Sequence, residues 1–114
     1  MLAQWSREQL SERLRIGRAP GGAPAGFLTV GPSRDEEAPR PLELQALNVD
    51  SAFHGTGLAQ ALMRDLLQER PAYLWVVEEN PRARRFYEKE GFRADGGLKV
   101  DADLGDLREI RMTR

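Results

Sequence analysis

The chain has 114 residues, 40% hydrophobic and 31% charged, a composition that fits one small folded domain rather than a disordered tail. Seventeen basic and eighteen acidic residues leave a formal charge of −1, so no net positive field favours nucleic acid or an anionic membrane surface. Without cysteine, and with a single histidine, the sequence excludes disulfides and cysteine nucleophiles and gives no basis for a metal site.

The sequence also lacks the patterns of a membrane segment and of a secretion signal. No stretch approaches the roughly 20 apolar residues that a membrane-spanning helix needs. The N-terminus carries Ser6, Glu8 and Glu12 where a signal peptide needs an apolar region. We therefore expect a cytoplasmic protein with neither a membrane nor a nucleic acid as a partner.

The first predicted element is a short helix over residues 5–12. Ser6 and Gln9 have the spacing of a capping box, in which two side chains satisfy free backbone N–H groups at a helix start. Leu10 would supply the apolar contact that holds this helix on the rest of the domain.

A hairpin and a loop are predicted next. Leu14 and Ile16 alternate with arginines, and the turn residues 20–22 separate them from the apolar run 27–30. This is the pattern of a β-hairpin. Residues 31–41 contain three prolines and an acidic cluster, which predicts a solvated loop that buries no core.

Residues 42–49 predict a strand in which the alternation of apolar and polar residues shifts by one position. Leu42 and Leu44 fall on one face, whereas Leu47 and Val49 fall on the other. A β-bulge within the strand would explain the shift, and an ordinary irregularity at a sheet edge would explain it equally well.

The second half of the chain alternates between helix and strand patterns. Apolar residues recur at helical spacing over 57–69, and a nearly continuous aromatic and β-branched run at 73–77 predicts a strand covered on both faces. Asn80 as N-cap, Pro81 at the first position and a glycine after the end predict a helix of about ten residues. With a closing strand over 107–113, this order predicts an α/β fold with crossover connections.

The segment from His54 to Ala59 leads a strand into a helix through two glycines. The first amides of a helix have no internal partner and lie at the positive end of the helix dipole. Gly55 and Gly57 leave this backbone unshielded, so a pyrophosphate can approach the amides of residues 55–59. The glycine spacing fits neither a Walker loop nor a dinucleotide-binding fingerprint, and by itself it is more typical of a simple turn.

Two motifs together resemble the GNAT superfamily of N-acetyltransferases, most strongly over residues 43–92. The family's signature Gln/Arg-x-x-Gly-x-Gly/Ala is matched by the segment from His54 to Ala59, with histidine in the first place. The family's later asparagine, Phe-Tyr pair and Gly-Phe pair are matched by Asn80, Phe86-Tyr87 and Gly91-Phe92. Each motif alone is weak, but the two in this order, separated by one helix and one apolar strand, form a specific combination.

The resemblance implies a mixed central β-sheet flanked by helices, with splayed central strands. The strands that contain Leu47-Asn48-Val49 and Trp75-Val76-Val77 would part, and the pantetheine arm of acetyl-coenzyme A would bind to free backbone groups in the gap. A bulge near Ala46 would help to open that gap. The implied cofactor contacts are Leu47, Asn48, Val49, His54, Gly55, Thr56, Gly57, Leu58, Ala59, Asn80 and Tyr87.

The resemblance also implies transfer of an acetyl group from acetyl-coenzyme A directly to an amine in a ternary complex. An alkyl ammonium has a pKa of about 10.4, so a base must take its proton before attack. Glu43 is the candidate base, acting directly or through a water, and Glu78 and Glu79 are weaker alternatives. Tyr87 is the candidate donor of a proton or hydrogen bond to the departing sulfur, as this tyrosine commonly is in the family.

Each of these side chains also has a purely structural interpretation. A strand glutamate such as Glu43 is more often solvated surface than a base, and Tyr87 can be a core aromatic beside Phe86. Asn80 caps its helix in either case, and we expect it to contact the cofactor as well. His54 replaces the usual long side chain beside the pyrophosphate, whereas a loop histidine more often faces solvent.

The chain departs from the family pattern at its start. We expect a single domain over 1–114, with the cofactor core at about 42–92 and a reduced N-terminal part at 1–31. Family members usually carry a strand and one or two helices ahead of the first hairpin, and these help to form the acceptor pocket. The expected acceptor is an amine of a small molecule or a protein, and a homodimer is expected to cover the exposed sheet surface.

Two other functions compete with acetyl transfer. A non-catalytic module that binds coenzyme A or serves in interactions, with a degenerate acceptor site, is supported by the reduced N-terminal part. The second competitor is nucleic-acid binding through a basic helix face, which consists of Arg82, Arg84, Arg85 and Lys89. The balanced charge of the chain disfavours this function. The same face could instead meet the 3′-phosphate of coenzyme A, or it is merely solvated.

Overall fold

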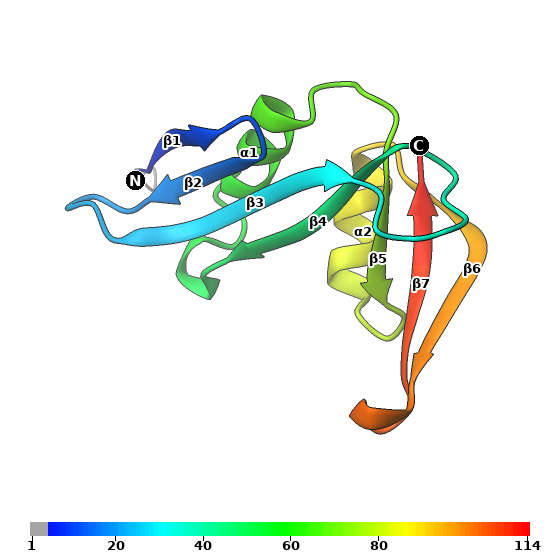
Figure 1. Ribbon diagram of the computed structural model, residues 1–114. Coiled ribbons are helices and arrows are strands. Elements are labelled where there is room, and N and C mark those ends of the chain that lie inside the picture. Colours follow the sequence, from blue (N-terminus) through cyan, green and yellow to red (C-terminus); the bar gives the residue numbers. More distant parts are fainter. Residues whose placement is uncertain (1–4) are drawn as a thin grey trace. The chain divides into compact units, whose positions relative to one another are not determined.

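The computed structural model describes residues 5–114, which fold into two units (Figure 1). The described residues up to Pro32 and Leu44–Arg70 form the first unit, and Ser33–Glu43 and Pro71–Arg114 form the second. The hydrogen-bonded strands follow the order β1-β2-β3-β4-β5-β7-β6, and β4 contributes residues to both units. This mixed sheet with its helices confirms the predicted α/β class.

The helices and strands of the described chain have the following bounds. The strands are β1 (Ser6–Ser11), β2 (Leu14–Arg18), β3 (Pro24–Pro32), β4 (Leu42–Val49), β5 (Tyr73–Val77), β6 (Arg93–Asp101) and β7 (Leu107–Thr113). The α-helices are α1 (Leu58–Leu66) and α2 (Pro81–Lys89), and the short 3-10 helices are η1 (Ser51–Phe53) and η2 (Ala102–Leu104). Within residues 5–114, no helix has the length and apolar character that crossing a membrane requires.

The helix predicted over residues 5–12 is wrong, because this segment is the edge strand β1. All six residues of β1 are exposed, and Leu10 keeps 47% of its surface accessible, so the segment has no apolar face that a helix would bury. Antiparallel pairing with β2, in which Glu8 lies opposite Ile16, satisfies its backbone instead. A capping-box spacing does not outweigh a neighbouring strand that offers hydrogen bonds.

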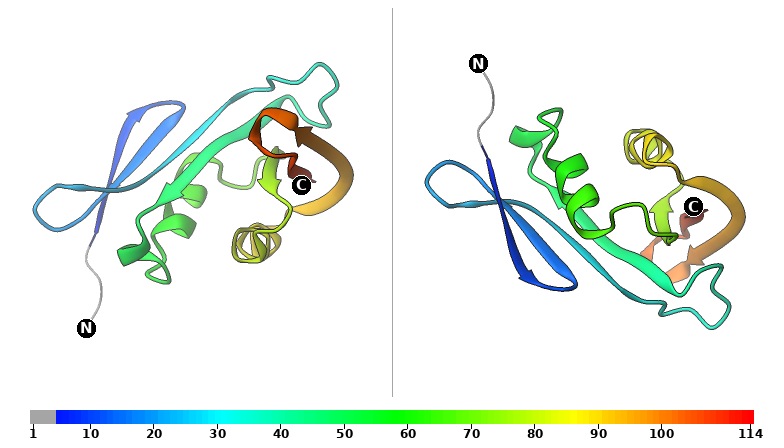
Figure 2. Two further views of the ribbon diagram at one scale, coloured as in Figure 1. Left: turned by 90° about the horizontal axis from the view of Figure 1, so that it is seen from below. Right: turned by 90° about the horizontal axis from the view of Figure 1, so that it is seen from above.

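The predicted hairpin is confirmed as β2 and β3, which pair antiparallel with Ile16 opposite Phe27. Helix α1 packs on this part of the first unit (Figure 2). It buries Leu58, Leu62, Met63 and Leu66. A Cβ atom at Gly17 would lie 2.6 Å from Leu58 Cδ1, so glycine at this position lets α1 approach β2 closely. The helix is shorter than the predicted 57–69 because Gln68 adopts a left-handed backbone with φ of 57°.

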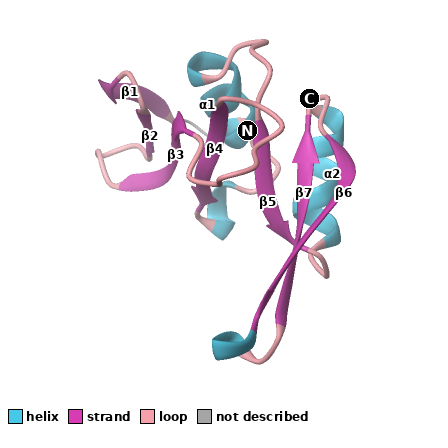
Figure 3. Cartoon of the chain, turned by 45° about the vertical axis from the view of Figure 1, so that its right-hand side comes forward, coloured by secondary structure: helices cyan, strands magenta, loops and turns pink. Residues whose placement is uncertain are grey.

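The second unit contains the predicted strands 73–77 and 107–113 as β5 and β7. These pair antiparallel, with Val76 opposite Ile110, and β6 pairs antiparallel with the other edge of β7 (Figure 3). The predicted helix after Asn80 is confirmed as α2: the Asn80 side chain accepts a hydrogen bond from the Ala83 amide at 3.1 Å, and Pro81 is the first helical residue.

The predicted loop at 31–41 is confirmed only after Pro32, where β3 ends. The loop is not simply solvated, however, because Ser33 and Asp35 are partly buried and hydrogen-bond to side chains of β5. The loop therefore belongs to the packing of the second unit, and it carries part of the candidate site.

Candidate active site

The N-terminus of α1 has no side-chain cap. Its N-cap residue, Gly57, has φ of 89° and ψ of 1°, and Gly55 also has a positive φ of 76°. A Cβ atom added at either glycine would meet nothing within 4 Å, so the backbone here is uncovered. The first amides of a helix have no intrahelical partner, and this tip therefore presents donors at the positive end of the helix dipole.

The side chains of the preceding loop turn back onto the loop itself. Asp50 caps η1 by accepting a hydrogen bond from the Ala52 amide at 3.0 Å. The His54 ring nitrogen Nε2 lies 2.9 Å from the Val49 carbonyl oxygen, and the Thr56 hydroxyl donates to the Phe53 carbonyl at 2.6 Å. His54 and Thr56 thus fix the loop and leave the helix tip open.

The other residues predicted around this tip are placed in the same unit. Asn48 is exposed, whereas Leu47 and Val49 are half-buried on β4. Leu58 is fully buried in the core, so its amide rather than its side chain is available at the tip, and Ala59 is half-buried.

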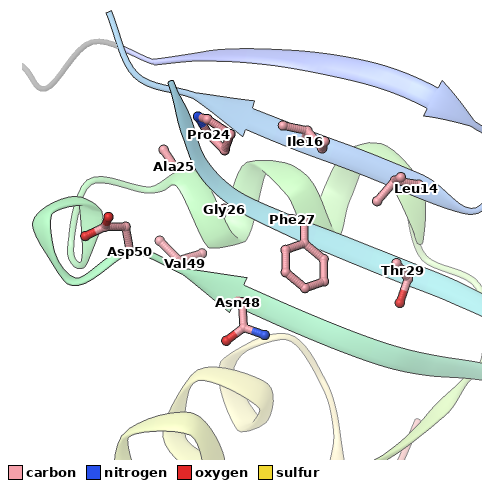
Figure 4. Close-up of a pocket in the computed structure, with 10 residues that line it drawn as sticks. All are labelled: Leu14, Ile16, Pro24, Ala25, Gly26, Phe27, Thr29, Asn48, Val49 and Asp50. Atoms are coloured by element: carbon pink, nitrogen blue, oxygen red, sulfur yellow. The ribbon is translucent and has the colours of Figure 1, made fainter. Parts of the chain in front are cut away.

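A cavity of about 640 Å³ lies on the β2, β3 and β4 strands of the first unit (Figure 4). Leu14, Ile16 and Phe27 give it a largely apolar lining, and Asn48 and Val49 form the wall on β4. The lining is completed by Pro24, Ala25, Gly26, Thr29 and Asp50. Two of the three β4 residues predicted to contact the cofactor therefore also border an apolar hollow.

Tyr87 lies in the second unit and is 8% exposed. Its ring packs edge-on against Phe86, with 5.5 Å between centroids, and against Phe92, with 6.1 Å. Burial raises the pKa of Tyr87 to about 12, because the phenolate would lose its hydration. At neutral pH the hydroxyl therefore keeps its proton and is available as a donor.

Glu43 is buried, with 2% of its surface exposed, and is held in an ion pair. The Arg34 guanidinium donates from Nη2 to Oε2 at 2.9 Å and from Nε to Oε1 at 3.2 Å, and the Arg34 amide donates to Oε1 at 3.0 Å. The Tyr73 hydroxyl lies 3.4 Å from the same oxygen. The hydrogen bond to Glu43 also raises the pKa of Arg34, so the guanidinium keeps its charge throughout the neutral range.

Asp35, which sequence reasoning missed, is the centre of a second group of contacts. Its carboxylate accepts hydrogen bonds from the Tyr73 hydroxyl at 2.6 Å, from Trp75 Nε1 at 2.9 Å and from Lys99 Nζ at 2.8 Å. The Lys99 ammonium also lies 4.2 Å from the Trp75 ring centroid. The one available signal was that Tyr73 and Trp75 carry polar atoms on a buried strand and so required partners.

These contacts shift two pKa values in opposite directions. The hydrogen bond from Lys99, followed by those from Tyr73 and Trp75, holds the pKa of Asp35 well below its usual value. Burial, together with the hydrogen bond to Asp35, raises the pKa of Tyr73 to about 12. At neutral pH, Asp35 is therefore a carboxylate and Tyr73 keeps its phenolic proton.

The remaining predicted residues have structural contacts of their own. Asn80 is exposed and uses its side chain as the α2 cap. Glu78 forms an ion pair with Arg108 at 2.9 Å, and Glu79 is exposed. On the basic helix face, Arg84 donates to the Glu78 carbonyl oxygen at 2.9 Å.

Known proteins share this sequence pattern. The model of the acetyltransferase (GNAT) domain matches residues 15–94, more than half of the chain. The chain belongs to the GNAT acetyltransferase family. It is 32% identical over 101 residues to probable N-acetyltransferase Rv2775 of Mycobacterium tuberculosis, a match that covers 81% of this chain and 57% of the relative. The chain spans about half the length of the curated relatives that it matches.

Solved structures share the fold. Ard1 from Thermoplasma volcanium matches with a TM-score of 0.73 and 24% identity, over 90% of this chain and 69% of that one. Naa50 of Arabidopsis thaliana, in complex with the bisubstrate analogue CoA-Ac-MVNAL, matches with a TM-score of 0.73 and 16% identity, over 89% of this chain and 71% of that one. The match to the family model confirms the GNAT family that was predicted from two sequence motifs.

The contacts of Asp35 predict how stability changes in acid. A carboxylate whose pKa is lowered by folding stabilises the protein above its unfolded pKa of about 3.9, and this stabilisation is lost as the pH falls through the lower folded value. We expect the free energy of unfolding to fall below about pH 4, and to fall less in Asp35→Asn, because that variant lacks the titrating group.

Urea unfolding at a series of pH values from about 7 to about 2 measures this difference. Asp106→Asn is the matched control, because Asp106 is exposed and has the left-handed backbone that asparagine also tolerates. A fall in Asp35→Asn as steep as in the wild type would contradict the prediction.

Proposed function

We propose that this chain transfers an acetyl group from acetyl-coenzyme A to an amine of a small molecule or a protein, by direct attack of the amine within a ternary complex. One observation carries the proposal: the N-terminus of α1 has no side-chain cap at the glycine motif of a GNAT family member. Unpaired amides at the positive end of a helix are the groups that bind a diphosphate.

In this proposal the cofactor follows the end of β4 and the start of α1. The pyrophosphate binds to the amides of residues 55–59, although the Thr56 amide also donates to the Phe53 carbonyl oxygen at 3.3 Å. The pantetheine arm runs along Leu47-Asn48-Val49. His54 and Thr56 contribute by holding the loop, since their side chains contact backbone carbonyls. Leu58 and Ala59 belong to the same proposed contacts at the tip. For Asn80 and Tyr87, contact with the cofactor is proposed on the family's motif alone.

Tyr87 is proposed to stabilise the departing thiolate with a hydrogen bond. An alkyl thiol has a pKa of about 8.5, whereas the pKa of Tyr87 is raised to about 12. Complete transfer of the proton to sulfur would therefore be uphill by roughly 5 kcal/mol, at 1.36 kcal/mol for each pH unit. Donation of a hydrogen bond needs no such transfer and acts where negative charge develops.

Glu43 is proposed to accept the proton of the acceptor ammonium. Because its carboxylate is 2% exposed, the proton would reach it through a water rather than by direct contact. The guanidinium of Arg34 compensates the buried charge. A buried glutamate that acts as a base requires such a cationic partner.

The same ion pair supports a second function. A carboxylate that already accepts three hydrogen bonds from Arg34 is occupied, and a domain with an occupied base would hold coenzyme A without using it. A non-catalytic module that binds coenzyme A is therefore the alternative. It shares the cofactor site with the proposed enzyme and differs from it in turnover.

We further propose that the whole chain acts as a single cytoplasmic acetyltransferase domain and that a second copy covers its exposed apolar surface. The cavity lined by Leu14, Ile16 and Phe27 supports the second point, because exposed apolar surface of this kind favours association. No metal ion is needed in this scheme, since a hydrogen-bond donor and a base account for the proton movements.

Titration calorimetry and turnover separate the two functions. The proposed enzyme should bind acetyl-coenzyme A and release coenzyme A thiol in the presence of at least one amine from a panel containing spermidine, an aminosugar, an arylalkylamine and a peptide with a free N-terminus. Binding without turnover on any of them would favour the module. If the chain did not bind acetyl-coenzyme A, both proposed functions would be ruled out.

The α1 tip is tested by replacing Gly57 with a charged and a neutral side chain. Asp and Asn have the same shape, and Asn tolerates the left-handed backbone of Gly57, so the pair isolates the charge. We expect Gly57→Asp to weaken acetyl-coenzyme A binding by about 100-fold relative to Gly57→Asn, through repulsion of the phosphates. Equal Kd values for the two variants in calorimetry would show that the phosphates lie elsewhere.

Tyr87 is tested by removing its hydroxyl alone. We expect Tyr87→Phe to keep the Kd for acetyl-coenzyme A within about twofold and to lower kcat by about 100-fold, because the donor acts on charge that develops during the reaction. Phe86→Leu is the control for the aromatic contact, since Phe86 packs on the same ring without a polar atom. A parallel loss of binding and of kcat in Tyr87→Phe would assign the hydroxyl to structure.

A further inference from the structure

The loop between β3 and β4 connects Asp35 to the proposed base through its neighbour in the chain, Arg34. We propose that Asp35 is a positioning residue for acetyl transfer, which fixes this loop so that Arg34 is held against the buried carboxylate of Glu43. The inference rests on the proposed function for the role of Glu43, but the contacts that carry it lie entirely within the second unit.

The first step is that both neighbours of Arg34 are anchored to β5. Ser33 Oγ lies 2.5 Å from the Tyr73 hydroxyl and accepts a hydrogen bond from the Asp35 amide at 3.1 Å. The Asp35 carboxylate in turn binds Tyr73 and Trp75. The backbone of Arg34 is therefore fixed on both sides, and its amide meets Glu43 Oε1 at 3.0 Å.

The second step concerns what would hold Arg34 in place without this anchor. The Arg34 side chain is 62% exposed, whereas that of Glu43 is 2% exposed. An exposed arginine loses conformational freedom when it is held in one geometry, and this cost reduces the net strength of an exposed ion pair. Fixing the backbone beforehand removes part of that cost, so Asp35 strengthens a pair in which it does not itself take part.

The third step is the competition for the Tyr73 proton. The Tyr73 hydroxyl is 2.6 Å from Asp35 Oδ2 but 3.4 Å from Glu43 Oε1, so its hydrogen bond goes mainly to Asp35. Without the Asp35 charge, we expect the Tyr73 hydroxyl to turn towards Glu43 and the Arg34 side chain to leave it. Glu43 would lose more than it gains, because the Arg34 side chain supplies two charge-assisted hydrogen bonds and Tyr73 supplies one neutral bond.

The Glu43 carboxylate contacts Arg34 of the loop and Tyr73 of β5, while Asp35 takes part in neither contact directly: it binds Tyr73 and is the chain neighbour of Arg34. Replacing Asp35 should therefore loosen the hold of Arg34 on Glu43. Acetyl transfer that depends on this carboxylate should slow as a result.

The experiment compares wild type, Asp35→Asn and the control Asp106→Asn, using the fastest amine of the panel. We expect Asp35→Asn to keep the Kd for acetyl-coenzyme A within about twofold and to lower kcat/KM at pH 7 about tenfold. In a Glu43→Gln background the same replacement should change kcat/KM by less than about twofold. An unchanged kcat/KM in Asp35→Asn, or an equal loss in that background, would overturn the proposal.

A measurement without turnover separates this inference from the proposed function. In 15N-labelled protein the Arg34 Nε–H group should give a resolved proton–nitrogen signal, protected from exchange by its bond to Glu43. The signal should persist in Asp106→Asn and be lost in Asp35→Asn. Its persistence in Asp35→Asn would refute the positioning role even if the chain transferred no acetyl group. Its loss in a protein without turnover would support the positioning while the proposed function failed.

Discussion

The buried carboxylate of Glu43 imposes the strongest constraint on the second unit. It is the one charged side chain within residues 5–114 that is fully buried, and removing an ion from water costs several kcal/mol unless a partner compensates it. Arg34 is that partner, so the loop after β3 must fold back across β5. Glu43 also lies opposite Tyr73 where β4 pairs with β5. The loop, the ion pair and this strand pairing therefore depend on one another.

In the first unit, the main feature is a helix N-terminus that no side chain caps. Helix starts are ordinarily capped by the side chain of their N-cap residue, and glycine at position 57 provides none. Thr56, which has the chemistry of a cap, instead donates to the Phe53 carbonyl, and His54 bonds to the Val49 carbonyl. The polar side chains thus stabilise the loop, while the amides that follow are left for a ligand.

Local patterns predicted the parts of the fold that local forces determine. The spacing of apolar residues predicted α1, and the Asn80 cap predicted the start of α2. The segment 5–12 was mistaken for a helix because capping spacing does not reveal whether a neighbouring strand offers hydrogen bonds. Asp35 was missed because its partners Tyr73 and Trp75 lie 38 and 40 residues away, a pairing that only the folded chain creates.

The two groups proposed for catalysis need opposite protonation states at one pH, and burial alone would give only one of them. Burial keeps Tyr87 protonated, which suits a hydrogen-bond donor. The same burial would also keep a carboxylic acid protonated, which would disable a base. Glu43 differs from Tyr87 in that a guanidinium lies against its side chain. The proposed donor therefore lies among aromatic rings, whereas the proposed base lies beside a cation, and burial acts on the two in different surroundings.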